Sequence, residues 1–425
     1  MYMLDRAKEL AYNTIEMPNF LEVKKDTFKN GLNLFYIDGG DLDICHLELI
    51  FEAGTKVQSK PLQAALCNAM LLEGTLKSSA DEIHNQIDAY GAYTNLDVNA
   101  DRAIVSLYTL NKYFDTVVPI FINAIKNANF PEKEFTILKE QRRQSFRINS
   151  EKVDFTARNT FFGHIYKNHS YGQIAVLENF DTIQREDLEA FHALHYKAAN
   201  FKTYLSGKTP PNAKEILEDL LGDWTLSKQN PRVLFTKKTS IAKIHIPKKG
   251  ALQSAIKIGC VSLTSHDKDY FELKFLAVIL GGYFGSRLMN NIREDKGLTY
   301  GIGAMCVQKE EAGCFVISTE VKGESVQLAL TEIYKELKRL REELIPQEEI
   351  NLVKSYVMGQ ILAASDGSFA QAKLLKNLHT NALDFDFYKS YQIVLNELNP
   401  QALMDMANKY LKEEDLCEVV VGVIS

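Results

Sequence analysis

Several familiar signals are absent from this 425-residue sequence. Its six cysteines form no Cys-x-x-Cys pair and sit among apolar or strand-like neighbours, which indicates reduced, mostly buried thiols in a cytoplasmic protein. No run of 18 apolar residues occurs, so we expect no membrane-spanning helix. The net charge is −6, so no overall positive field would recruit nucleic acid or anionic lipid.

Signals for targeting and for common active sites are also missing. Residues 1–10 mix charged and apolar side chains without an apolar core or a small-residue cleavage site, so we expect no secretory signal. There is no Gly-x-Ser-x-Gly elbow and no local cysteine-protease signature. Gly281, Gly282 and Gly285 do not fit Gly-x-Gly-x-x-Gly, and their spacing favours close backbone packing at a helix start over phosphate binding.

What the sequence does contain is a long-range duplication. The chain is too long for one ordinary core, and its 46% apolar and 24% charged residues are typical of a globular protein with two or more domains. One offset of 215 residues separates the helix-opening Pro131 from Pro346, the helical Leu188 from Leu403, and the strand-closing Gly207 from Gly422. Two unrelated domains could share such matches by chance, but matching structural roles favour a duplication.

The early parts of the two halves correspond as well. Strands are expected at 47–51 and 255–261 and at 103–108 and 314–319, apolar helices at 62–73 and 271–294, and amphipathic helices from Phe114 and from Val326. The sequence therefore predicts an α+β protein of two tandem homologous domains, residues 1–226 and 227–425. Each would be a mixed or antiparallel sheet with helices on one side, joined by a linker at 227–231 after a helix at 213–224.

The segment 62–72 is apolar almost all round and ends at Glu73-Gly74-Thr75, where glycine would stop a helix. Taken alone, this segment is typical of a buried core helix. Together with Phe51-Glu52-Ala53-Gly54-Thr55 before it, however, it resembles the N-terminal signature of the insulinase/pitrilysin zinc metallopeptidases, which include mitochondrial processing peptidase.

That resemblance implies a His-x-x-Glu-His motif, in which two imidazoles one turn apart bind zinc and the glutamate holds the attacking water. This chain has Ala65, Asn68 and Ala69 at those positions. The third ligand of the family, a glutamate in the helix that begins near Pro131, falls on Ser145, next to the arginine pair 142–143. We therefore expect no metal bound by this chain.

The second half resembles the other signature of the family. Residues 280–288 lead into 291–300, and the resemblance implies that Arg293 and Tyr300 help to hold the substrate and the transition state. A fixed guanidinium and a phenol are good donors to a peptide carbonyl or a developing oxyanion. The alternative is structural: Arg293 would cap a helix before Gly297, and Tyr300 would pack in the next strand.

The histidines offer a competing metal site. His192 and His195 are three residues apart on an expected helix, and His164 and His169 could complete a site. No motif with a general base frames them, so we interpret them as satisfied core or surface histidines.

The resemblance implies a division of labour, in which a homologous zinc-bearing subunit pairs with this chain and supplies the zinc. The heterodimer would hydrolyse peptides or unfolded segments held as an added strand on a sheet edge, without nucleic acid or membrane. The main alternative is a non-catalytic scaffold subunit of a larger assembly. An independent peptidase with a new metal site is a weaker one.

Overall fold

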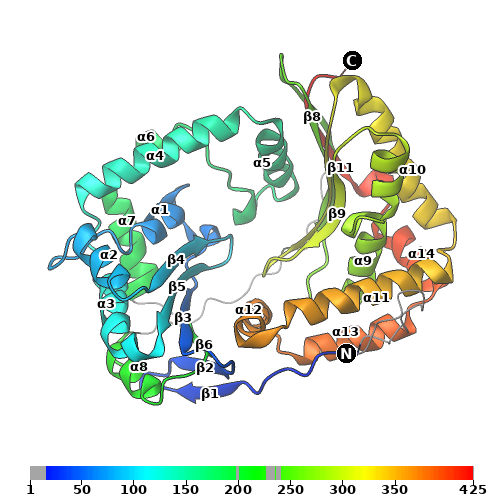
Figure 1. Cartoon of the computed structure of the whole chain (residues 1–425). Coiled ribbons are helices and arrows are strands. Elements are labelled where there is room, and N and C mark those ends of the chain that lie inside the picture. The colour runs from blue at the N-terminus through cyan, green and yellow to red at the C-terminus, as the bar shows by residue number, and fades with distance from the viewer. Residues whose placement is uncertain (1–15, 198–200, 226–234, 236–240, 425) are drawn as a thin grey trace, which may run out of the picture.

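The chain folds around two β-sheets, which flank the middle of the molecule (Figure 1). The computed structural model describes residues 16–197, 201–225, 235 and 241–424. The first sheet has the order β1-β2-β6-β3-β5-β4 and the second β7-β11-β8-β10-β9. The expected linker 227–231 and the expected domain boundary after residue 226 lie outside the described residues.

The strands of the first sheet are β1 (Lys24–Thr27), β2 (Asn33–Asp38), β3 (Ile44–Phe51), β4 (Tyr93–Val98), β5 (Ala103–Leu110) and β6 (Phe201–Gly207). Those of the second are β7 (Lys243–Pro247), β8 (Ser254–Ser262), β9 (Ile302–Val307), β10 (Gly313–Val321) and β11 (Cys417–Gly422). Each sheet is mixed, because β2 runs parallel to β6 and β7 parallel to β11, whereas the remaining pairs are antiparallel.

The helices of the first half are α1 (Gln63–Ala69), α2 (Ala80–Asp88), α3 (Phe114–Lys126), α4 (Glu132–Ser150), α5 (Val153–Ile165), α6 (Asn179–Thr182), α7 (Arg185–His192) and α8 (Ala213–Leu221). The second half has α9 (Tyr270–Ala277), α10 (Val326–Glu342), α11 (Gln347–Ala364), α12 (Gly367–Thr380), α13 (Asp386–Glu397) and α14 (Pro400–Tyr410). The predicted α+β fold with two helix-covered mixed sheets is confirmed. No described helix is long and apolar enough to cross a membrane.

The duplication is visible in matching helix starts and strand ends. Pro131 and Pro346 directly precede α4 and α11, where their missing N–H groups cost nothing. Gly207 and Gly422 end β6 and β11 with φ of 95° and 139°, a backbone region that glycine adopts without strain. Each half also has its own core between sheet and helices, with α3 and α10 burying the expected apolar stripes.

Each sheet is also covered on its second face by a helix from the other half. Helix α5 packs on β8 and β11, and α12 packs on β2 and β6, as Figure 1 shows. On α5, Asp154 pairs with Lys257 of β8 at 2.6 Å. The expectation of helices on one side of each sheet was therefore incomplete, because the apolar second face of each sheet is buried by this exchange.

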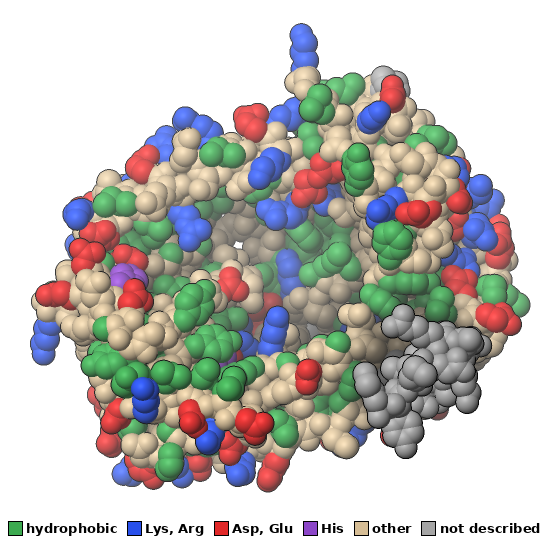
Figure 2. All heavy atoms as spheres, in the orientation of Figure 1, with side chains coloured by type: hydrophobic (Ala, Val, Ile, Leu, Met, Phe, Trp, Pro, Cys, Tyr) green, Lys and Arg blue, Asp and Glu red, His purple; other side chains and the backbone are tan. Residues whose placement is uncertain are grey.

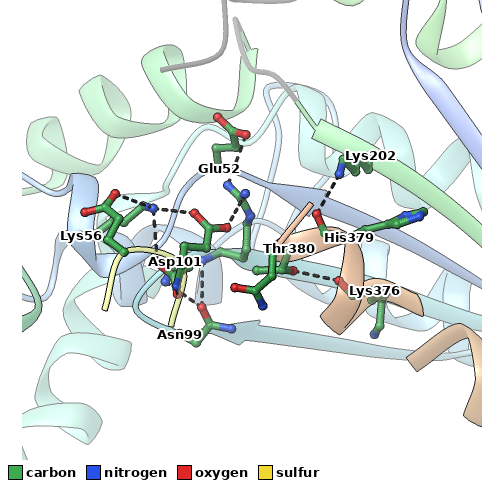
Figure 3. Close-up of polar contacts among 12 residues, drawn as sticks. Glu52, Lys56, Asn99, Asp101, Lys202, Lys376, His379 and Thr380 are labelled. Carbon is green, nitrogen blue, oxygen red and sulfur yellow. Dashed lines mark hydrogen bonds and ion pairs between the residues drawn. The ribbon is translucent and has the colours of Figure 1, made fainter. Parts of the chain in front are cut away.

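A buried ion cluster joins the halves near α5 (Figure 3). The Lys56 ammonium lies 2.6 Å from a carboxylate oxygen of Glu310, 3.0 Å from Glu311 and 3.3 Å from Asp101. Glu311 also lies 2.9 Å from the ring nitrogen Nε2 of His169. Lys56, Asp101 and His169 belong to the first half, whereas Glu310 and Glu311 connect β9 to β10, so the cluster holds the β9–β10 hairpin against the first half.

A second set of polar contacts joins α12 to the first sheet, also in Figure 3. Lys376 of α12 pairs with the buried Glu48 of β3. The Lys202 ammonium donates to the backbone carbonyl of His379 at 3.1 Å, and the Tyr204 hydroxyl lies 2.8 Å from the His379 ring nitrogen Nδ1. The exchanged helix is thus fixed by charge pairing as well as by apolar contact.

Two expected helices differ from the prediction. The helix expected at 62–72 is α1, which ends at Ala69. After it, backbone N–H groups bond to carbonyls three residues earlier instead of four, and Gly74 then packs against the loop that precedes α4. The helix expected at 271–294 is broken into α9, a wide-turn segment at Val278–Gly282 and another at Met289–Asp295. A Cβ on Gly281 would lie 2.4 Å from the Ala304 nitrogen of β9, so the close packing expected there occurs at a helix end.

Candidate functional site

The four residues that the sequence resemblance assigns to the zinc-motif positions line one pocket. Ala65, Asn68 and Ala69 lie on α1 and Ser145 lies on α4, and together they border a cavity of about 380 Å³, hereafter the α1–α4 pocket. Its other lining residues are Leu62, Leu66, Leu96, Asp97, Val98, Arg142, Phe146, Asn149, Phe155 and Phe180. The structure therefore brings together all four residues that the sequence signature singles out.

Asn68, where the family resemblance implies a general base, makes two internal hydrogen bonds with its side chain. Its side chain is buried, its amide nitrogen donates to the Asp97 carbonyl at 3.1 Å, and its amide oxygen accepts from the Tyr196 hydroxyl at 2.9 Å. Burial raises the pKa of the Tyr196 hydroxyl, so this group stays protonated and donates. Asn68 thus fastens α1 to β4 and to the segment after α7, and it has no basic atom for proton transfer.

The α1–α4 pocket does not fit a zinc ion. Its two alanines have no donor atom, Ser145 is a poor zinc ligand, and the guanidinium of Arg142 adds positive charge. Throughout the described part of the chain, no group of three or more His, Cys, Asp or Glu side chains is placed to hold a metal ion. The chemistry of the lining residues thus supports binding of organic groups rather than of a divalent cation.

The pocket opens beside the edge of the first sheet. Strand β4 is the last strand of that sheet, and within the described residues it pairs only with β5. Figure 1 shows β4 and β9, the edge strands of the two sheets, on either side of the middle of the molecule, and Figure 2 shows a hollow there. An edge strand has backbone N–H and C=O groups that can pair with an added strand.

Arg293 and Tyr300 lie on the other half, before β9. The Arg293 guanidinium stacks over the ring of Phe284, 4.6 Å from its centroid, and lies 3.3 Å from a Glu294 oxygen. Tyr300 is 92% exposed, so the alternative that it packs in the next strand is wrong. The helical segment ends at Asp295, shortly before Gly297, whose N–H donates to the Arg293 carbonyl, but the guanidinium does not form this cap.

The histidines are not gathered into a site. The ring nitrogen Nε2 of His192 lies 2.7 Å from the Ile125 carbonyl, and His169 pairs with Glu311 of the second half. Burial lowers the pKa of His195, which keeps its ring neutral. The interpretation of satisfied histidines is confirmed for His192 and His169.

Part of the pocket wall was not predicted from the sequence. Arg142 was noted only as one of two arginines beside Ser145, yet it lies one turn before Ser145 on α4 and lines the same cavity. Residues three and four apart share a helix face, so this spacing alone could have placed Arg142 and Asn149 beside Ser145. The aromatic residues of the wall come from three separate helical segments, and no sequence signal connects them.

Comparison with known proteins agrees with the fold. Residues 43–173 match the family described as Insulinase (Peptidase family M16), and residues 182–357 match the Peptidase M16 inactive domain. Two solved structures share the fold: a peptidase M16 inactive domain from Pseudomonas fluorescens (TM-score 0.87, 22% identity, 95% of this chain and 99% of that chain) and a protease from Helicobacter pylori (0.86, 18%, 95% and 100%).

Relatives of similar length carry contrasting descriptions. An uncharacterized zinc protease of Rickettsia bellii is 21% identical over 93% of this chain and 90% of its own length. The protein described as Non-peptidase homolog YmxG of Helicobacter pylori is 20% identical over 92% of this chain and 91% of its own. The family matches span both halves of the fold, and the chain therefore belongs to the insulinase (M16) peptidase family, with the N-terminal domain and the inactive C-terminal domain of that family.

Proposed function

We propose that this chain is the non-zinc, substrate-positioning subunit of a heterodimeric insulinase-type metalloendopeptidase that acts on peptides or unfolded segments. One observation carries the proposal: the four residues that the family resemblance assigns to the zinc-motif positions line one pocket beside an edge strand, and they offer no good zinc ligand. In this proposal the homologous partner supplies the zinc and the attacking water.

The second half supports a role in holding substrate. Tyr300 is almost fully exposed and Arg293 is half-buried against the ring of Phe284, so neither side chain is consumed by the core. A phenol and a guanidinium at these positions can donate hydrogen bonds to a peptide carbonyl presented from a partner. The edge strands β4 and β9 could each pair with an extended substrate through backbone hydrogen bonds.

The test is to mix purified subunits. This chain alone should contain no stoichiometric zinc and should not cleave quenched peptides, whereas adding a homologue from the same organism that carries His-x-x-Glu-His should produce cleavage. Stoichiometric zinc or robust activity in the isolated chain would refute the proposal.

A second arm tests the two named side chains within the active pair. Arg293→Ala and Tyr300→Phe should each lower kcat/KM by about a hundredfold if they hold a developing oxyanion. The control Arg185→Ala removes a surface arginine of α7, 3.0 Å from Glu189, and should leave kcat/KM unchanged. Size-exclusion chromatography checks that every variant still pairs. Full kcat/KM in both test variants would mean that these roles are wrong.

The rival function is a non-catalytic scaffold subunit. It is favoured by one observation, the similarity to a Helicobacter pylori protein described as a non-peptidase homologue. A chain that joins an assembly but stimulates no zinc-bearing homologue would support the scaffold function.

A further inference from the structure

The α1–α4 pocket is lined by a charged side chain for which the described part of the chain provides no ion-pair partner. Arg142 lines the pocket, and within the described residues no carboxylate lies within 4.0 Å of its guanidinium. The neighbouring Arg143 differs, because it faces away from the pocket and lies 3.0 Å from a carboxylate oxygen of Asp181. A guanidinium offers five N–H donors in a planar fork, a geometry that matches a carboxylate.

The donors of α4 line one face of the helix. Arg142, Ser145 and Asn149 are three and four residues apart, so their side chains follow one another along the pocket wall. The Asn149 oxygen accepts from Lys152 at 2.8 Å, which leaves the amide N–H₂ group to donate toward the pocket. A guanidinium, a hydroxyl and an amide along one wall form a donor-rich surface that favours an anion.

The one acidic residue of the pocket does not oppose an anion. Leu96, Asp97 and Val98 all line the pocket from β4, and Leu96 and Val98 pack against the core of the first half. Successive side chains of a strand point to opposite faces, so the Asp97 carboxylate points to the other face of the sheet. Asp97 reaches the pocket through its backbone carbonyl, which accepts from Asn68. Among the described residues that line the pocket, Arg142 is thus the one with a charged group directed into it.

Aromatic side chains also line the pocket. Phe146 lies 5.3 Å from Phe155 and 5.6 Å from Phe180, measured between ring centroids, and all three rings line the pocket. A ligand that satisfies both the donor groups and the aromatic rings therefore combines a carboxylate with a neighbouring bulky apolar group. The cavity of about 380 Å³ is large enough for one such unit of a peptide but not for a folded domain.

We propose that the α1–α4 pocket is a carboxylate-binding site, in which Arg142 pairs with the carboxylate of an extended peptide lying along β4 while the three phenylalanines hold its neighbouring apolar side chain. The position of the peptide rests on the proposed function. The carboxylate is either the C-terminal α-carboxylate of the peptide or an aspartate or glutamate side chain, and both have the same chemistry.

The experiment measures peptide binding to the isolated chain by fluorescence anisotropy. Three labelled peptides of six residues, the length of β4, share an alternating Val/Thr sequence. One ends in leucine with a free carboxylate, one ends in leucine amide, and one ends in glutamate followed by leucine amide. We expect at least one carboxylate peptide to bind about tenfold more tightly than the neutral amide, the usual scale of a charge-assisted hydrogen bond. The preferred peptide identifies the source of the carboxylate.

Variants tie the preference to the pocket. Arg142→Ala should remove the carboxylate preference, Arg142→Lys should retain part of it, and the matched control Arg143→Ala should keep it fully. Ala65→Phe adds a large ring at an exposed position of the pocket lining and leaves Arg142 in place, so it should weaken binding of the carboxylate peptides. Circular dichroism checks that each variant is folded.

The proposal is overturned if the acidic and neutral peptides bind equally, if none binds, or if the preference survives Arg142→Ala. These outcomes are separable from those of the mixing experiment. A chain that stimulates a zinc-bearing homologue but shows no carboxylate preference would refute only this site. A chain that keeps the preference but stimulates no homologue would refute only the proposed function.

Discussion

Replacing Asn68 by alanine should destabilise the first half of the protein. The substitution removes two buried hydrogen bonds and leaves the Tyr196 hydroxyl without an acceptor and the Asp97 carbonyl without its side-chain donor. An unsatisfied buried polar group costs about 1–3 kcal/mol, so the free energy of unfolding should fall by about 2–5 kcal/mol. Asn68→Glu, which introduces the carboxylate of active family members, loses the same donor and buries a charge, so it should also destabilise the fold.

The single tryptophan makes this effect measurable. The indole N–H of Trp224 donates to the Tyr196 carbonyl at 2.6 Å, so its fluorescence reports on the segment that Asn68 holds. Urea unfolding followed by this signal should show a lower midpoint for Asn68→Ala. The control Ser145→Ala alters an exposed side chain of the same pocket and should change the free energy by less than about 0.5 kcal/mol.

A double-mutant cycle tests the assigned hydrogen bond itself. Tyr196→Phe removes the hydroxyl, so it should cost less in the Asn68→Ala background than alone, with a coupling energy of about 1 kcal/mol or more. The reasoning is refuted if Asn68→Ala unfolds within about 0.5 kcal/mol of the natural chain, or if the two substitutions are additive.

Three further perturbations test other parts of the structure. Burial lowers the pKa of His46 to about 3, so as the pH falls the unfolded chain binds the proton before the folded chain does. The free energy of unfolding should be at its full value above about pH 6.5 and fall by up to about 1.4 kcal/mol per pH unit as the pH drops toward 3. His46→Phe should flatten this dependence in urea titrations at several pH values. Lys376→Met leaves the buried Glu48 carboxylate without its partner and should lower the free energy of unfolding by about 3–5 kcal/mol. Adding Glu48→Gln should recover much of the loss. An equal loss in the double variant would contradict this pairing. Gly281→Ala places a Cβ against the backbone of β9 and should lower the melting temperature more than Gly297→Ala, where φ is 63° and the space is open. The reverse order would show that the close approach at Gly281 does not determine which residue is tolerated there.

Much of the architecture could be predicted because its signals are local. Pro131 and Pro346 mark helix starts, and Gly207 and Gly422 mark strand ends, through backbone preferences that need no tertiary information. The same holds for the amphipathic stripes of α3 and α10. The pocket residues Ala65, Asn68, Ala69 and Ser145 were found through the spacing of a known motif, although that spacing does not reveal the hydrogen bonds of Asn68.

The features that could not be predicted depend on distant contacts. The break after α9 is fixed by the approach of Gly281 to β9, which lies more than 20 residues later in the chain. The edge strand β4 contains Asn95 and Asp97, residue types that are depleted in strands, and it was missed for that reason. The exchange of α5 and α12 produces no sequence pattern of its own, because the apolar residues of an amphipathic helix have the same spacing whichever sheet the helix covers.

The exchange of α5 and α12 constrains how the protein is made. Helix α5 is complete at Ile165, but part of the sheet that it covers, β11, is complete only at Gly422, far later in the chain. The apolar residues of α5 therefore lack the strand that covers them until β11 has emerged from the ribosome, so we expect the nascent first half to bind chaperones. The same interlocking predicts that the two halves, expressed as separate polypeptides, would be poorly soluble apart and would reassemble when produced together.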